Sequence, residues 1–304
     1  MTTCSDGSLA AGEQLEGSAP QALGWVALEQ NGPWGAKAFT ASHLDPEMGR
    51  ALEAAAAAHD VRPSLIRTPG RHADDVAGPR TVLVARTVPG ATWLLAGTVP
   101  DPRDLLALDW AALRAGDRDA VRRSLPALTP DDRAHLLVCT NGTRDVCCAS
   151  LGRPVALAGE AARPGRVWEV THTSGHRFAP TAVLLPAGTL HGRMATDDAV
   201  VLLDEADAGR TVLAGSRGRS TWSAPGQVAE LAVRALTGET GLDALPQVAV
   251  RTVDEHAWTV AVGHADGQRW AVDVRSEATA LERKESCLKG AVPLRRWHPY
   301  VEQA

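Results

Sequence analysis

Two successive stretches of the chain have the same expected order of secondary-structure elements, and this repetition limits the possible folds more than any other feature of the sequence. In the first stretch the residue pattern predicts strands at 24–29, 61–67, 80–88 and 91–99. In the second stretch it predicts strands at 134–139, 167–171, 181–185 and 189–193. One helix is expected between the first two strands of each stretch, at 46–59 and at about 147–161. The chain is therefore expected to have an α/β fold.

Cap and turn residues mark where these elements begin and end. Asp45-Pro46 and Asp101-Pro102 have the cap-then-proline pattern of a helix start, and Pro89-Gly90 separates the last two strands of the first stretch. In the second stretch Pro186-Ala187-Gly188 separates the hairpin strands, and Thr196-Asp197-Asp198 begins a last helix. Strand, loop, helix, strand, hairpin, helix is the thioredoxin-like order. We interpret the first block as a divergent tandem copy of the second.

These elements divide the chain into four parts. Residues 1–20 are small and polar and are expected to form an arm, 21–128 and 129–212 the two α/β blocks, and 213–304 a C-terminal extension. The extension is expected to contain a helix at 224–236 and a hairpin with strands at 257–264 and 268–274, joined by an Asp-Gly turn. Residues 279–296 have no clear pattern.

Composition and charge exclude some classes of function. The net charge is −5 and no basic stripe is present, which argues against a nucleic-acid partner. No run of about 18 or more apolar residues is present, so no membrane span is expected. The first residues also lack the basic start and apolar stretch of a targeting signal. The expected location is the cytoplasm.

The five cysteines are Cys4, Cys139, Cys147, Cys148 and Cys287. An odd number, with three of them in one short stretch, does not resemble the disulfide framework of a secreted domain. A local group of cysteines in a reducing compartment indicates metal binding or redox chemistry instead. Cys4 and Cys287, far from the others in sequence, are interpreted as small buried residues rather than ligands.

Two cysteine positions and two histidines are expected to meet at one end of the sheet. Cys139 ends a predicted strand, and the pair Cys147-Cys148 begins the helix that follows it. His172 and His176 are spaced like residues on one face of a helix, but Gly175 and the neighbouring Thr and Ser residues favour a loop at the end of a strand. In a thioredoxin-like order both loops lie at the same end of the sheet. Two thiolates and two imidazoles suit either zinc or an iron–sulfur cluster.

Ligand spacing distinguishes these two possibilities only in part. A zinc knuckle usually has cysteines about two to four residues apart, so that one tight turn presents both. The spacing here is C-x8-C, or C-x7-C if Cys147 is the ligand. A loop of that length can enclose a larger group, which favours a cluster over zinc.

The segment from Cys139 through Arg-Asp-Val-Cys-Cys148, followed by His172-Thr-Ser-Gly-His176-Arg-Phe-Ala, resembles the sucrase/ferredoxin-like family. This family is related to the thioredoxin-like 2Fe–2S ferredoxins. The similarity extends to Gly32-Pro33-Trp34-Gly35, to 216–220 and to the helix that contains Gln227 and Glu230.

The resemblance implies that residues 129–212 form a thioredoxin-like ferredoxin domain with a 2Fe–2S cluster. The implied ligands, for the cluster or for zinc as the alternative, are Cys139, Cys148, His172 and His176. Cys147 departs from the family pattern, and because adjacent side chains on a helix point about 100° apart, only one of the two cysteines is expected to reach the cluster. We favour Cys148. Candidates to hydrogen-bond the sulfurs or orient the ligands are Arg144, Asp145, Cys147 and Arg177.

The expected function is electron transfer with a redox partner protein, coupled to proton movement at the histidines. One alternative is a structural zinc protein with the same ligands. The other is a thiol-based oxidoreductase that uses Cys147 or Cys148, although the chain has no C-x-x-C motif. A redox carrier is favoured over a substrate-turning enzyme, and no carboxylate pair indicates glycoside hydrolysis. Gly32-Pro33-Trp34-Gly35 is interpreted as a turn with a packed tryptophan, with a docking surface as the alternative. Arg217-Gly218-Arg219 is interpreted as a solvated loop, with a site for phosphate or an acidic partner as the alternative.

Overall fold

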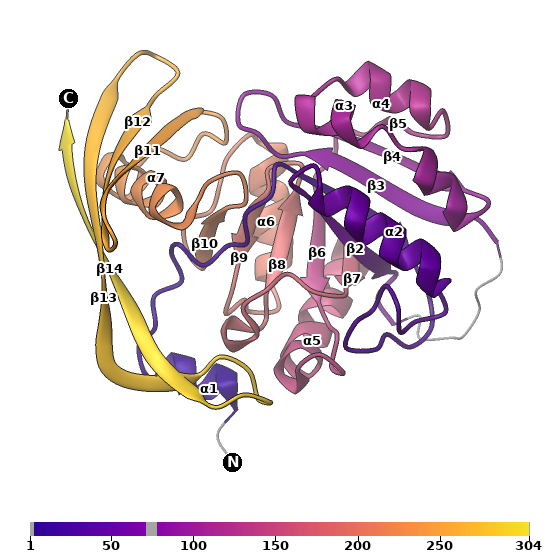
Figure 1. Ribbon diagram of the computed structural model, residues 1–304, viewed down its shortest axis with the longest axis horizontal. Helices are drawn as coiled ribbons and strands as arrows, with labels where there is room; N and C mark the ends of the chain where they lie inside the picture. The colour runs from indigo at the N-terminus through magenta and orange to yellow at the C-terminus, as the bar shows by residue number, and fades with distance from the viewer. Residues whose placement is uncertain (1–2, 71–77, 304) are drawn as a thin grey trace.

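Residues 3–70 and 78–303 are described by a computed structural model, in which a ten-stranded mixed sheet forms the centre of the molecule (Figure 1). The strands of its first half are β1 (Gly24–Glu29), β2 (Val61–Arg67), β3 (Arg80–Arg86), β4 (Trp93–Val99) and β5 (Thr129–Pro130). Those of its second half are β6 (His135–Cys139), β7 (Val167–Val170), β8 (Ala182–Leu185), β9 (Thr189–His191) and β10 (Ser216–Arg219). The α/β fold class is confirmed.

Helices pack on the strands of each half. The first half has α2 (Pro46–Ala57), the 3-10 helix η1 (Pro102–Ala107), α3 (Trp110–Ala115) and α4 (Arg118–Ser124). The second half has α5 (Val146–Ala162), the 3-10 turn η2 (His176–Phe178) and α6 (Asp198–Asp207). Within the part of the chain that the structure describes, no helix combines the length and the hydrophobicity needed to cross a membrane.

The two halves have the same strand topology. In the first half β1 pairs parallel with β2 and antiparallel with β3, and β3 pairs antiparallel with β4. In the second half β6 pairs parallel with β7 and antiparallel with β8, and β8 pairs antiparallel with β9. The repeated element order of the sequence is thus repeated in the sheet. Because one sheet runs through both halves, in the order β10-β9-β8-β6-β7-β2-β1-β3-β4-β5, the division at residues 20, 128 and 212 stays a prediction.

A buried ion pair lies where the two halves join. β2 and β7 pair antiparallel, and Arg67 stands opposite Glu169 in their register. The guanidinium donates to Glu169 Oε2 at 2.8 Å and to the carbonyl of Gly32 at 2.8 Å, and it stacks on the ring of Trp34 at 4.0 Å. Thr140 donates to the same carboxylate oxygen at 2.9 Å. Side-chain exposure is 5% for Arg67 and 0% for Glu169, so the pair depends on its own contacts rather than on water.

Apolar clusters fill both sides of the sheet. One packs α2, α3 and α4 against the first four strands, and another packs α5 and α6 against β6, β7 and β8. A third cluster contains strand residues from both halves, among them Trp25, Ile66 and Val170, and it includes Cys139 and Cys148. The two halves therefore share a core as well as a sheet.

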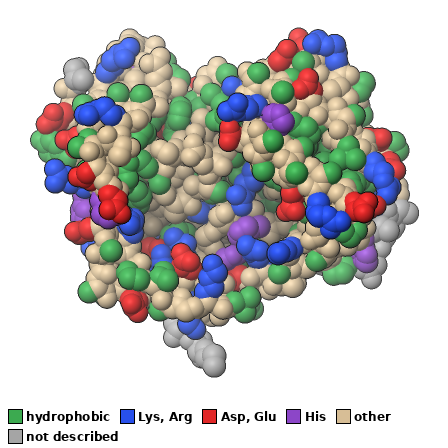
Figure 2. Space-filling view, in the orientation of Figure 1, with side chains coloured by type: hydrophobic (Ala, Val, Ile, Leu, Met, Phe, Trp, Pro, Cys, Tyr) green, Lys and Arg blue, Asp and Glu red, His purple; other side chains and the backbone are tan. Residues whose placement is uncertain are grey.

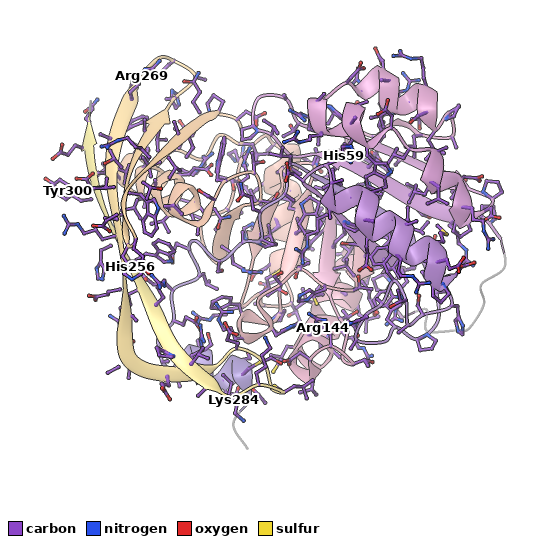
Figure 3. All side chains as sticks on the ribbon, viewed as in Figure 1. His59, Arg144, His256, Arg269, Lys284 and Tyr300 are labelled. Atoms are coloured by element: carbon purple, nitrogen blue, oxygen red, sulfur yellow. The ribbon has the colours of Figure 1, made fainter. Side chains whose placement is uncertain are left out.

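The C-terminal extension is a second sheet packed on α7 (Ala224–Thr237). Its strands are β11 (Gln247–Asp254), β12 (Ala257–Gly263), β13 (Arg269–Lys284) and β14 (Ala291–Gln303), in that order. The predicted helix and hairpin are confirmed. The 279–296 segment, which the sequence left unassigned, contains the far ends of β13 and β14, which extend past the sheet as a long ribbon that reaches α1 (Cys4–Ala10) (Figures 1 and 3).

One expectation is wrong, and one region has more structure than predicted. The arm expected for residues 1–20, of which the first two lie outside the described part, contains the helix α1, capped by the side chain of Thr3. The supposed loop Arg217-Gly218-Arg219 belongs to the buried strand β10, with 0% and 1% exposure for its two arginines. Long-range contacts explain why Arg217 is buried, because it donates to Ser18 in the arm and to carbonyls of the 173–174 loop.

Replacing Arg67 with methionine is expected to lower the free energy of unfolding by about 3–5 kcal/mol, because the buried Glu169 carboxylate would lose the guanidinium that lies 2.8 Å from it. Arg122→Met is the matched control, since Arg122 and Asp119 form an exposed pair at 3.9 Å. The control should change the free energy by less than about 0.5 kcal/mol. Urea unfolding measures both, and equal losses would contradict a special role for the buried pair.

Candidate metal centre

The first two predicted ligands are positioned by a strand end and a helix start. All residues of β6 are buried, and Cys139 is its last residue. Asp145 caps α5 by accepting a hydrogen bond from the backbone N–H of Cys147 at 3.0 Å. Cys148 therefore lies in the first turn of α5, and its side chain packs in the same apolar cluster as Cys139.

The two histidines lie on the turn that follows β7, as the sequence predicts. His172 is in an irregular segment, and His176 begins the short turn η2. Gly175 between them has a φ of +72°, a region that glycine adopts without strain. A Cβ at this position would lie 2.6 Å from a guanidinium nitrogen of Arg217. That arginine donates to the carbonyl of Ser174 at 3.0 Å and so holds the histidine turn in place.

The structure brings the four predicted ligands together. The sulfur of Cys148 lies 3.3 Å from Nδ1 of His176. The rings of His176 and His172 stack with centroids 4.7 Å apart and an interplanar angle of 23°. Cys148 and His172 both act on the thiol of Cys139 and lower its pKa. The four side chains therefore lie near one another.

Burial and mutual contacts set the protonation of this group. The hydrogen bond from Cys148 holds the pKa of Cys139 well below that of an ordinary thiol, and His172 lowers it further, although burial opposes both effects. The same contact raises the pKa of Cys148, as does burial. Burial and the neighbouring His172 lower the pKa of His176 to about 4. His176 is therefore neutral at pH 7, the form in which an imidazole can donate a lone pair to a metal.

The donor atoms of these four residues are of the kinds that bind a metal ion or an iron–sulfur cluster. Nδ1 of His172 is buried and has no hydrogen-bond partner among residues 3–70 and 78–303. A buried polar atom without a partner is rare in folded proteins, and a bound metal is one explanation for it. Two sulfurs and two imidazole nitrogens are ligands that zinc and 2Fe–2S clusters both accept.

The first half of the chain supports the loop that carries the cysteines. Asn141 donates to the carbonyl of Gly35 at 3.1 Å, and Arg144 donates to the carbonyl of Ala36 at 3.2 Å. Trp34 is buried, and its indole N–H donates a hydrogen bond to the carbonyl of Gln30 at 2.9 Å. The interpretation of this motif as a turn with a packed tryptophan is confirmed.

The four residues predicted to support the ligands lie in different places. Arg144 reaches the 35–36 turn, and Arg177 pairs with Glu13 at 2.8 Å. Cys147 points away from Cys148, because the two residues are neighbours on a helix. Asp145 faces the same way as Cys147.

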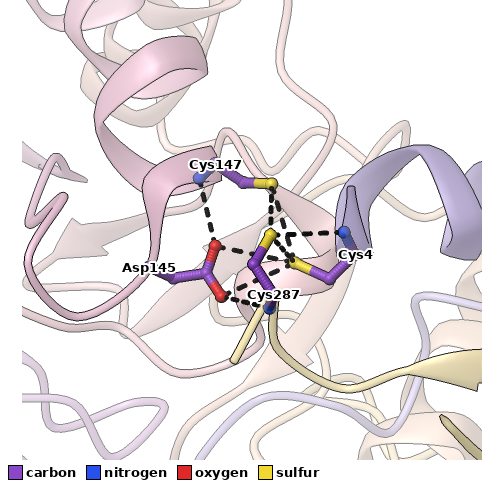
Figure 4. Close-up of side chains that lie close together, drawn as sticks. All are labelled: Cys4, Asp145, Cys147 and Cys287. Carbon is purple, nitrogen blue, oxygen red and sulfur yellow. Dashed lines mark hydrogen bonds between the residues drawn. The ribbon is translucent and has the colours of Figure 1, made fainter. Parts of the chain in front are cut away.

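A second group of sulfurs forms on this other side of α5 (Figure 4). The Sγ atoms of Cys4, Cys147 and Cys287 are 3.4 to 3.6 Å apart. The carboxylate oxygens of Asp145 lie 3.6 and 3.7 Å from the sulfur of Cys4. All four side chains offer a ligand atom within 4.8 Å of the others, an arrangement that could hold a metal ion. Sequence reasoning missed this group, since Cys4 and Cys287 have no local spacing to each other or to Cys147.

Comparison with known proteins identifies the family of the chain. No curated protein and no solved structure matches the chain. The family model described as sucrase/ferredoxin-like matches residues 15–218, which include both cysteines and both histidines of the first group. This match covers more than half of the 304 residues. The chain belongs to the sucrase/ferredoxin-like family.

Proposed function

We propose that this chain is an electron-transfer protein that holds a 2Fe–2S cluster on Cys139, Cys148, His172 and His176. The observation that supports the proposal most strongly is the grouping of these four side chains, with the buried Nδ1 of His172, which has no hydrogen-bond partner within the described part of the chain, among them. The cluster would supply one-electron redox chemistry. Cys148, rather than Cys147, is the proposed ligand, because Cys147 faces the second group of sulfurs.

The remaining side chains would keep this ligand set rigid. Arg217 is fully buried and holds the carbonyls of Thr173 and Ser174, which fixes the histidine turn. Burial and the nearby guanidinium groups of Arg177 and Arg62 lower its pKa to about 9, so it is still charged at pH 7. Ligands whose neighbouring residues are fixed by hydrogen bonds need to move little when the site gains or loses one electron.

The histidine side of the site is where a redox partner would approach. Both cysteines are buried, whereas both histidines are partly exposed. A cavity of about 490 Å³ beside His172 is lined by Lys37, Arg62 and Arg144, together with the carboxylates of Glu53 and Asp60. Figure 2 shows Lys, Arg and His side chains gathered in the hollow at the centre of this face. We propose that a redox partner protein docks here, with the histidines as the shortest route for the electron.

The two alternatives differ in how well the site supports them. A structural zinc ion would use the same four ligands, and the spectroscopic experiment below separates it from a cluster. A thiol-based oxidoreductase needs an accessible sulfur, and both Cys147 and Cys148 are 1% exposed. The cytoplasmic location stays a prediction.

Anaerobically purified protein is expected to be red-brown, with visible absorption and a paramagnetic signal after reduction by dithionite, because a reduced 2Fe–2S cluster has an unpaired electron. His172→Cys and His176→Cys should keep the cluster and shift the signal, since each changes one donor atom. Absorption and electron paramagnetic resonance measure this. A colourless protein that contains zinc and no iron would rule out electron transfer at this site.

The midpoint potential is expected to lie between about −300 and about −50 mV, because two neutral imidazoles replace two thiolates. His176→Cys should lower it, since a thiolate adds negative charge. A histidine ligand can also lose its remaining ring proton in the oxidised state, so the potential should fall as the pH rises. Redox titration of the loaded protein from about pH 6 to about pH 10 tests this, and a flat profile would remove the proton coupling.

Gly175→Ala is expected to reduce the iron content of the purified protein. The substitution adds strain of about 1–2 kcal/mol at a positive φ, and its Cβ collides with the arginine that holds the histidine turn. Gly165→Ala is the matched control, with a φ of +75° and no atom within 4 Å of the added Cβ. Both variants have a strained backbone, but only the first should lose iron. Equal iron content would show that Arg217 is not needed to position the histidines.

A further inference from the structure

The second group of sulfurs is not explained by the electron-transfer proposal. Cys4 comes from α1, Cys147 from the start of α5, and Cys287 from the turn between β13 and β14. Cys4 and Cys147 are 143 residues apart in sequence, and Cys147 and Cys287 are 140 residues apart. Three segments that are remote in sequence thus each bring one cysteine to the same point, where Cys4 and Cys147 are buried and Cys287 is partly buried.

The distances among these sulfurs suit a shared metal ion. Cys4–Cys147 is 3.6 Å, Cys147–Cys287 is 3.4 Å, and Cys287–Cys4 is 3.5 Å. A disulfide would bring two sulfurs to about 2.05 Å. Thiolates at about 2.3 Å from a tetrahedral zinc ion are about 3.8 Å apart, close to what is observed. The three sulfurs are also nearly equidistant, whereas a disulfide would single out one pair.

Asp145 completes the group as an oxygen ligand. Figure 4 shows its carboxylate facing Cys4 and Cys287 from the end of the α5 cap. The backbone N–H of Cys147 donates to Oδ1 at 3.0 Å, and that of Cys287 donates to Oδ2 at 2.8 Å. These two bonds fix the orientation of the carboxylate and leave lone pairs on both oxygens. Hydrogen bonds of this kind usually support a metal-bound carboxylate.

The environment of the Asp145 carboxylate also suits a bound cation. Asp145 is 1% exposed, and no Lys, Arg or His among the described residues forms a salt bridge with it. Two backbone N–H groups and the cysteine sulfurs surround it instead. A metal that contacts a buried carboxylate stabilises it further. A divalent ion would place its positive charge directly against Asp145, and after the release of three thiol protons the complete site would carry a net charge of −2.

We propose that Cys4, Cys147, Cys287 and Asp145 bind one structural zinc ion, separate from the proposed 2Fe–2S site. Three soft thiolates with one carboxylate are zinc ligands and do not suit magnesium or calcium. The ion ties α1 and the β13–β14 ribbon to the start of α5. Glu13 adds a second tie in the same region, because it accepts from Arg283 at 2.6 and 2.7 Å and from Arg177 at 2.8 Å. The proposal does not depend on the function assigned to the first site.

Elemental analysis of the full chain, expressed with both zinc and iron supplied, tests the proposal. The wild-type protein should contain about one zinc per chain in addition to any iron. Cys4→Ser and Cys287→Ser should each lower zinc by at least about tenfold and leave iron unchanged. Ser5→Ala is the control, since it removes one hydrogen bond from the same helix, to the carbonyl of Ala179, and spares the thiols. It should keep its zinc.

Two further measurements separate this site from the first. A double variant His172→Ala and His176→Ala should lose iron and retain zinc, so the failure of one proposal does not imply the failure of the other. In wild-type protein the thiols of Cys4, Cys147 and Cys287 should resist alkylation until a chelator removes zinc, which tests the site without any substitution. Wild-type protein without zinc, a disulfide between any two of the three, or zinc unchanged in both serine variants would overturn the proposal.

Discussion

The antiparallel pairing of β2 with β7 is the contact on which the rest of the structure depends. Without it the chain would have two separate small sheets, each with an open edge. The Arg67–Glu169 pair is one of the two residue pairs in the register of this junction, and it is almost entirely removed from water. A buried ion pair gives little stability compared with apolar packing, but it strongly penalises any register that separates its partners. It therefore specifies how the two halves align.

This alignment also positions the candidate metal centre. The loop after β6, which carries the cysteines, lies against the 32–37 turn of the first half, and Thr140 in that loop hydrogen-bonds to Glu169. Cys139 is thus one residue away from the network that joins the halves. On the other side, Cys147 and Cys148 start the same helix and face two different groups of ligands. The first turn of α5 therefore connects these two groups of side chains rigidly.

Local signals explain what could be predicted from the sequence. Helix caps such as Asp45-Pro46, and turns such as Asp266-Gly267, lie next to the elements they delimit. The C-x8-C and H-x3-H spacings are equally short, so the first ligand group was recognisable. The role of Arg217 was not, because it depends on β10 pairing with β9 and on contacts with the arm. Cys4 and Cys287 were missed for the same reason, since only the folded ribbon brings them together.

The repeated topology has a consequence for how the two copies can differ. Two identical subunits that paired through the equivalents of β2 and β7 would form a two-fold symmetric dimer, and every ligand would then occur twice. The two halves of a single chain are free of that constraint. The loop after β6 carries cysteines, whereas the corresponding loop after β1 has none and carries Gly32-Pro33-Trp34-Gly35 instead. One half thus holds the candidate ligands and the other the wall that supports their loop, an asymmetry that no dimer of identical subunits can have.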